Sequence, residues 1–381
     1  MKTFTTLLAG CALAAAGLGT AQAQSGTAPS QVTLYGLIDA GVEYIDKVGP
    51  TGGTLWRMPS NTSAIPSRLG FRGQEALGDG LSAIFTLEMG LFTDSGTFGQ
   101  GGRAFGRQSF VGLAGPWGSV TLGRQYTMLF WSLLDADVMG ANVFGMGSFD
   151  AYIPNARSDN TLAWRGKFGG FSAGAAYSFG RDVVNGGPSP AGTNCPGESA
   201  TDGSACRAWS VLAKYDTQGW GAAFAYDRQQ GRTPASASDP VFGGLTSSSR
   251  SDSRLSLNGY VQLGAATRLG GGLLQRDNDG NPAARKSRLW YVGVSTPLAD
   301  LVTLDASLMT LRYSADAQRN ATLLAARVNY NLSKRSVMYA QVGRMANNRL
   351  SAVSVSGGAP GSAPAAGVDQ NGLSVGLRHS F

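Results

Sequence analysis

The stretch VTLYGLIDAGVEY, residues 32–44, alternates between apolar and polar side chains along its whole length. The two faces of the stretch carry Val32, Leu34, Ile38, Ala40, Val42 and Tyr44 on one side and Thr33, Tyr35, Asp39 and Glu43 on the other. A period of two residues predicts a β-strand, and this one is longer than the roughly five or six residues of most soluble strands. The stretch therefore predicts long strands with one apolar face.

The same alternation returns at residues 253–264, 302–313 and 322–332. Between such segments, short turns rich in glycine and proline, such as 78–80 and 115–118, alternate with long loops. Seven turns and eight loops then join sixteen strands. A regular succession of short turn and long loop predicts an antiparallel sheet whose turns lie at one end and whose loops lie at the other.

Composition limits the protein class further. Glycine supplies 55 of the 381 residues, and charged residues supply only 14%. Average soluble proteins have about 7% glycine and about 25% charged residues. No segment after residue 25 comes near the roughly 18 apolar residues of a spanning helix. The chain is therefore either a glycine-rich soluble β protein or a protein that crosses a membrane as strands.

A bilayer requires every backbone polar group to be paired within the protein, so a sheet that spans it must close. The predicted fold class is all-β: a sixteen-stranded antiparallel transmembrane β-barrel. Aromatic residues near strand ends on the apolar face favour the membrane interpretation, because such barrels carry aromatic girdles. These aromatic residues are Trp164, Phe171, Tyr177, Phe179, Trp209, Tyr215, Phe224, Trp290 and Tyr330.

The first residues predict export. Lys2 is basic, residues 7–18 are apolar, and Ala21-Gln22-Ala23 has the small-x-small pattern of a signal peptidase site. We expect cleavage after residue 23, which leaves residues 24–381 as one barrel domain and lowers the net charge from +7 to +6. The alternative, a lipoprotein box at residues 8–11, would leave too short an apolar segment before the cut.

Two cysteines remain after cleavage, Cys195 and Cys206, within a polar loop rich in proline and glycine. In an exported protein such a pair predicts a disulfide that restrains the loop. A metal site would need further ligands nearby, and this segment offers none. We therefore predict no metal.

The last segment also alternates, and its outward positions end on Phe381. A final strand with a terminal aromatic residue is typical of the signal that bacterial barrel assembly machinery recognises. This machinery is thus an expected partner.

Enzymatic and nucleic-acid functions have little support. His379, the only histidine, lies on the outward face of the last strand, where it could not act as a general base in a Ser/His arrangement. The glycines do not form a phosphate-binding loop of the required spacing. Lys and Arg are spread through strands and loops without a run. We predict no enzyme activity, no cofactor and no nucleic-acid partner.

Seven segments in order along the chain carry a family resemblance: residues 32–41, 67–73, 77–81, 85–88, 107–113, 118–125 and 372–381. In these motifs the chain resembles the trimeric general-diffusion porins of Gram-negative outer membranes, most closely their betaproteobacterial branch. This resemblance implies a homotrimer in outer-membrane lipid and lipopolysaccharide, and passive diffusion of small hydrophilic solutes.

Residues 127–155 form the longest apolar-rich, acid-bearing segment that does not alternate cleanly. The resemblance implies that this third external loop folds into the barrel and narrows it, with loop acids facing wall arginines. The implied wall arginines are Arg68, Arg107 and Arg157, and the candidate loop acids are Asp135, Asp137 and Asp150. The segment lacks the acid-bearing Pro-Glu-Phe-Gly-Gly core of enterobacterial relatives, since residues 143–147 read VFGMG.

Opposed charges across a narrow passage set its ion preference, and an excess of cationic groups concentrates anions. The net charge of +6 and the arginines predict weak anion selectivity. One alternative is a channel selective for small anions such as carboxylates or phosphate. An alternative of another class is an exported binding or adhesion protein with long loops on a soluble β scaffold.

Overall fold

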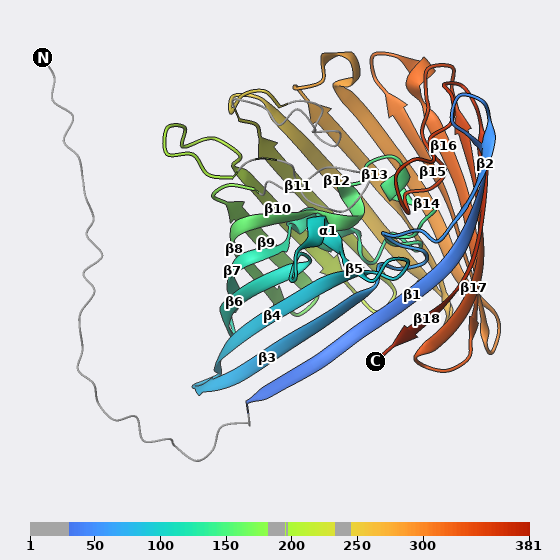
Figure 1. Cartoon of the computed structure of the whole chain (residues 1–381). Coiled ribbons are helices and arrows are strands. Elements are labelled where there is room, and N and C mark those ends of the chain that lie inside the picture. The colour runs from blue at the N-terminus through green and yellow to red at the C-terminus, as the bar shows by residue number, and fades with distance from the viewer. Residues whose placement is uncertain (1–29, 182–194, 196, 233–244) are drawn as a thin grey trace, which may run out of the picture.

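The computed structural model describes residues 30–181, 195, 197–232 and 245–381, and forms a closed antiparallel barrel (Figure 1). The predicted signal peptide, residues 1–23, lies outside the described residues. One sheet contains eighteen assigned strands in the described part of the chain. Two of them, β2 (Gly53–Arg57) and β5 (Thr97–Phe98), only extend loops beside β1 and β4. The other sixteen form the wall, which confirms the predicted fold class.

The wall strands are β1 (Gln31–Val48), β3 (Arg68–Gly78), β4 (Leu81–Phe92), β6 (Gln108–Gly115), β7 (Gly118–Tyr126), β8 (Arg157–Phe168), β9 (Phe171–Ser178), β10 (Ala208–Asp216), β11 (Trp220–Gln230), β12 (Ser251–Leu263), β13 (Thr267–Asn278), β14 (Lys286–Ala299), β15 (Val302–Tyr313), β16 (Ala321–Asn331), β17 (Ser336–Asn347) and β18 (Gln370–Ser380). The helical segments are α1 (Gly99–Gly102), α2 (Met128–Leu133), η1 (Met146–Ser148), η2 (Ile153–Asn155), η3 (Pro282–Ala284) and η4 (Ala317–Arg319). Among the described residues, no helix is long and apolar enough to cross a membrane.

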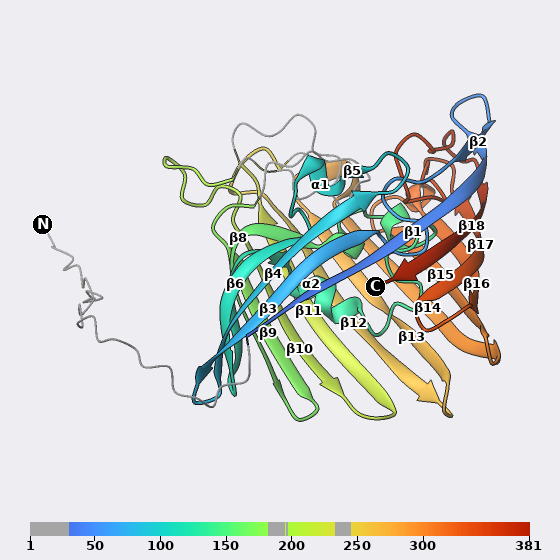
Figure 2. The ribbon, with the colours of Figure 1, turned by 60° about the horizontal axis from the view of Figure 1, so that its bottom comes forward.

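The barrel closes where its first and last strands meet. β1 pairs with β18 from Leu37 opposite Ser380 to Ile45 opposite Gly372. Beyond this ladder, the backbone amides of Gly36 and Phe381 each donate to the other residue's carbonyl oxygen at 3.1 Å. The two strands lie side by side in both views (Figures 1 and 2). Closure pairs the backbone N–H and C=O groups that the edge strands of an open sheet would leave without hydrogen bonds.

Side chains follow the predicted alternation. On β1, Val32 is 65% exposed on the outer face, whereas Asp39 and Glu43 on the inner face are at most 3% exposed. Most of the aromatic residues expected in girdles are exposed on the outer surface: Phe171, Tyr177, Phe179, Trp209, Tyr215, Phe224, Trp290 and Tyr330. The result is an apolar outer face and a polar lumen, the arrangement that a bilayer demands.

The connections also alternate as predicted. Seven short turns link strand pairs at one end, and eight longer connections link them at the other, counted over the strands that the structure describes. In the turn between β3 and β4, Asp79 and Gly80 both have positive φ angles, 49° and 77°. Such a left-handed pair suits the tight two-residue turns that join twisted antiparallel strands.

In the fourth loop, Cys195 and Cys206 form a disulfide with their Cα atoms 5.7 Å apart. The backbone amide of Cys206 donates to the carbonyl oxygen of Gly231 at 2.9 Å, and the amide of Arg181 donates to that of Cys206 at the same distance. The disulfide therefore lies where the loop after β9 meets the loop after β11.

Candidate functional site: the constriction inside the barrel

The third loop, residues 127–156, lies inside the barrel. Helix α2 at its start packs against β9, β10, β11 and β12 (Figure 2). Met128, Leu129, Val143 and Phe144 of this loop are completely buried. The inward fold, which the resemblance implied, thus rests on an apolar core between loop and wall.

Glycines in the wall make room for the loop. A Cβ atom on Gly270 of β13 would lie only 2.3 Å from the carbonyl oxygen of Ala136. At Gly343 and Gly372, on β17 and β18, a Cβ atom would come within 2.8 Å and 2.5 Å of the Phe144 ring. A wall with side chains at these positions would hold the loop away from the sheet.

A buried ion-pair network anchors the end of the loop. Asp150 accepts hydrogen bonds from Nε and Nη2 of Arg254 at 2.9 and 2.7 Å, and lies 3.6 Å from Arg276. Asp252 pairs with the same two arginines at 3.1 and 2.8 Å. Burial alone would raise the pKa of Asp150, but the two guanidinium groups hold it below its usual value. Two cations thus hold two carboxylates, one of them on the loop, at a mostly buried site.

Hydrogen bonds hold the loop at three further places. Tyr152 donates from its hydroxyl to Asp227 of β11 at 2.6 Å. The amide of Val143 donates to the carbonyl oxygen of Ser63 in the first loop, and its carbonyl oxygen accepts from Gly357 in the eighth loop. The third loop is therefore clamped between wall and neighbouring loops.

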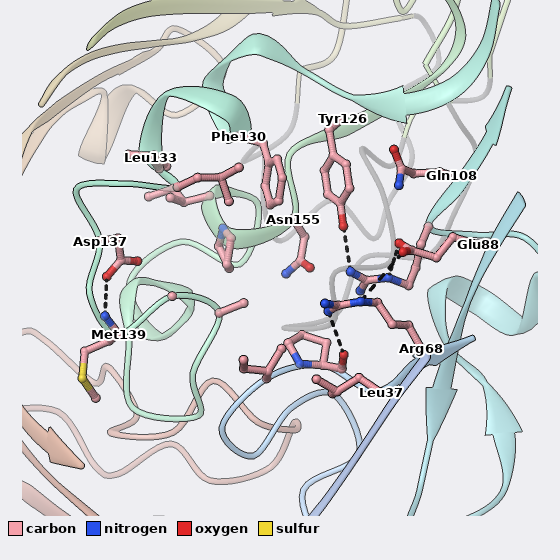
Figure 3. A pocket seen from close by; sticks show the side chains of 18 of the residues that line it. Leu37, Arg68, Glu88, Gln108, Tyr126, Phe130, Leu133, Asp137, Met139 and Asn155 are labelled. Atoms are coloured by element: carbon pink, nitrogen blue, oxygen red, sulfur yellow. Dashed lines mark hydrogen bonds and ion pairs between the residues drawn. The ribbon is translucent and has the colours of Figure 1, made fainter. Parts of the chain in front are cut away.

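A cavity of about 610 Å³ lies between this loop and the wall formed by β1, β3 and β4. Arg68 and Glu88 lie on the wall side, and Phe130 and Asp137 lie on the loop side (Figure 3). Arg107 also lines the cavity and pairs with Glu88. At this cavity the third loop narrows the lumen opposite the predicted basic wall.

The basic wall has more cations than anions. Nε of Arg107 donates to Glu88 at 2.7 Å, and Nη2 of Arg107 donates to the hydroxyl of Tyr126 at 2.7 Å. Arg68 lies 3.8 Å from Glu88, and its side chain is 29% exposed. Tyr35 donates a further hydrogen bond to Glu88 at 3.0 Å. One carboxylate therefore serves two guanidinium groups at the cavity.

Arg157, the third predicted wall arginine, lies directly behind this pair. Its Nη2 donates to the hydroxyl of Tyr126 at 2.7 Å, and its guanidinium carbon lies 4.4 Å from the centre of the Tyr126 ring. It is 1% exposed and does not line the cavity. Arg157 therefore adds positive potential through Tyr126 rather than direct contact.

The three candidate acids occupy different places. Asp137 lines the cavity with Arg68 and Arg107. Asp135 pairs with Lys214 of β10 and lies 3.7 Å from Arg268 of β13. Asp150 lies in the buried network described above and does not line the cavity. The structure thus brings one of the three acids to the arginines and uses the other two to attach the loop to the opposite wall.

Asp137 has an unusual protonation equilibrium. Burial raises its pKa to about 6, although the amides of Gly140 and Met139 and the Arg327 guanidinium act in the opposite direction. Met139 donates its amide to Asp137 at 3.1 Å. Arg327 of β16, which also lines the cavity, is itself paired with Asp305 at 2.8 Å. The charge of the loop face is therefore sensitive to mildly acidic pH.

Among the cavity residues that sequence reasoning did not assign to the site are Glu88 and Phe130. Glu88 carried a detectable signal, since it is an acid on the lumen-facing positions of β4, next to the strand that carries Arg68. Phe130 had no such signal, because its direction depends on how α2 packs.

Comparisons with known proteins agree with this architecture. A sequence profile of Gram-negative porins matches residues 7–350. The outer membrane porin protein 32 of Delftia acidovorans is 29% identical, and the match covers 99% of each chain. An outer membrane porin protein of Bordetella pertussis is 37% identical over 46% of this chain and 48% of its own.

Among solved structures, an anion-selective porin from Comamonas acidovorans superposes with a TM-score of 0.74 at 25% identity, covering 93% of this chain and all of its own. OmpT of Vibrio cholerae has a TM-score of 0.64 at 14% identity, covering 92% of this chain and 98% of its own, and shows the fold alone.

Replacing Asp150 with Asn should loosen the third loop. Breaking a buried ion pair costs about 3 kcal/mol, and the change leaves Arg254 and Arg276 with one carboxylate instead of two. We expect higher single-channel conductance and more frequent current transitions in planar bilayers. Asp316→Asn, at an exposed pair in the seventh loop, is the matched control. Wild-type current traces for D150N would contradict the anchoring role.

Lowering the pH from 7.5 to 5 should increase the preference for anions. A carboxyl group with a pKa of about 6 is mostly charged at the higher pH and mostly neutral at the lower one, so Asp137 ceases to oppose the arginines. The measurement is the reversal potential in a salt gradient at both pH values. Asp137→Asn should show the low-pH selectivity throughout, and an unchanged pH response in this variant would exclude Asp137 as its source.

Proposed function

Because the chain belongs to the Gram-negative porin family, and is therefore an outer-membrane channel and not an enzyme, we propose that it passes small hydrophilic solutes by passive diffusion with a weak preference for anions. One observation carries the selectivity: Arg68 and Arg107 share a single carboxylate at the cavity, and Arg157 adds a third positive charge directly behind them. Across the cavity, only Asp137 of the three loop acids opposes this charge.

The sign of the preference follows from electrostatics. Fixed cations in a narrow passage with low-dielectric walls raise the local concentration of anions. Asp135 and Asp150 contribute little to counter this, because each is paired with wall cations on the other side of the loop. The similarity to an anion-selective porin at 25% identity supports the same sign.

We extend the proposal to the assembly, a homotrimer embedded in outer-membrane lipid and lipopolysaccharide. The resemblance to trimeric porins supports it, as does an apolar groove of about 630 Å³ on the outer face. Small residues of β1, β17 and β18 line this groove, including Gly41, Ala340 and Gly376.

Chemical crosslinking of intact outer membranes tests the assembly. We expect a series of bands that ends at three chains, because a closed threefold ring offers no further contact surface. Bulky substitution at Ala340 should reduce the crosslinked yield, whereas the same change at Ala175, in an apolar depression bounded by β8, β9 and β10, is the matched control. A series that ends at one chain would contradict the proposal.

Replacing Arg68 with Gln should shift the reversal potential toward cations. At about 7 Å in water, one charge changes the energy of a passing ion by about 0.6 kcal/mol. That energy corresponds to about a threefold change in relative anion permeability. Arg68 is suited to this test because it is partly exposed, whereas removal of buried Arg107 would leave Glu88 without its closest partner.

Arg344→Gln is the matched control, since Arg344 is 58% exposed near the loop end of β17 and pairs with Asp369. It removes the same charge from the protein without changing the cavity. An equal shift in both variants, or none in R68Q, would assign the selectivity to the overall charge or to other groups.

A further inference from the structure

The cavity has two chemically different faces. Arg68, Arg107 and the Glu88 carboxylate that pairs with both lie on the wall face, whereas the loop face is mainly apolar. The apolar residues of the loop face are Phe130, Leu133, Leu134, Val138 and Met139. Leu134 is 50% exposed, although it lies inside the barrel. When an apolar solute covers a leucine that faces the passage, binding is favoured by about 25 cal/mol per Å² of apolar surface removed from water.

The aromatic part of the loop face is held rigidly. The rings of Phe130 and Tyr126 stack with centroids 3.7 Å apart and planes 13° apart. The Arg157 guanidinium covers Tyr126 as well, at 4.4 Å from the ring centre. A ring fixed in this column can bind an apolar solute without a large entropic cost of ordering its own side chain.

The wall face has an unpaired donor and a partly exposed guanidinium group. Nη1 of Arg107 lacks a hydrogen-bond partner among the described residues. Arg68 reaches the cavity with a partly exposed guanidinium group. Guanidinium groups bind carboxylates in a planar, two-point geometry. This face therefore suits an anionic oxygen group.

We propose that the constriction selects amphipathic monocarboxylates, with the carboxylate at Arg68 and Arg107 and an aromatic or branched aliphatic body against Phe130 and Leu134. This inference rests on the proposed function and adds a substrate class to it. The volume is sufficient, because an apolar cavity of about 150 Å³ already holds benzene. A solute with a second charge at its far end would place that charge against leucine and valine side chains and beside Asp137, at a desolvation cost.

Planar-bilayer recording with four probes tests the selection: phenylacetate, acetate, inorganic phosphate and neutral benzyl alcohol. We expect phenylacetate to reduce the current saturably, with a half-blocking concentration at least tenfold below those of acetate and phosphate. Benzyl alcohol should have no effect at the same concentrations. Equal half-blocking concentrations for phenylacetate and acetate would overturn the role of the apolar face, and block by benzyl alcohol would overturn the role of the arginines.

Variants locate the effect on the two faces. Leu134→Asn should raise the half-blocking concentration of phenylacetate about fivefold relative to that of acetate in the same variant. Leu350→Asn, at a leucine of similar exposure in the eighth loop, should leave that ratio unchanged. Anion-selective currents without preferential phenylacetate block would end this inference and leave the proposed function intact. Currents without anion preference would contradict the proposed function itself.

Discussion

Hydrocarbon offers no hydrogen bonds, and every other feature of this barrel depends on that constraint. It forces the ladder between β1 and β18 that closes the sheet. Once the sheet is closed, strict alternation assigns each strand residue either to lipid or to the lumen. The polar positions of all sixteen strands then converge on one interior, so a few arginines and acids far apart in sequence come to share one small cavity.

The same closure explains how a long apolar segment is accommodated within a polar lumen. Residues 127–156 could not lie on the lipid side with unpaired backbone groups, but inside they meet glycines, which leave the sheet backbone bare at Gly270, Gly343 and Gly372. Apolar packing alone would not specify an orientation. The ion pairs of Asp150 and Asp135 add direction, since each acid must reach particular cations on β10, β12 or β13.

Sequence reasoning predicted the strands, the alternation of turns and loops and the basic wall, because period-two patterns and turn residues are local properties of the chain. It could not rank the loop acids. Asp135, Asp137 and Asp150 have similar local surroundings in the sequence, and their roles differ only because Lys214, Arg254 and Arg276 arrive from strands about 80 to 125 residues away. Of the three candidate acids, only Asp137 lines the cavity with the arginines. The sequence shows only that glycine is abundant, whereas the packing shows that Gly270, Gly343 and Gly372 make room for the third loop.

The loss of two loop acids to anchoring changes the physics of the constriction. A passage with balanced opposite charges orders water across its width and favours dipolar solutes. Here the loop face retains one carboxyl group, whose charge is weakened by burial, together with a leucine and a phenylalanine. Water beside those side chains is bound weakly, so an apolar solute body can replace it at low cost. The anionic group of the same solute can meet the guanidinium groups on the other face, and both contacts then favour binding. The ion pairs of Asp135 and Asp150 thus attach the loop to the far wall and, because they draw these acids away from the cavity, leave the near face of the loop able to bind the apolar part of a solute.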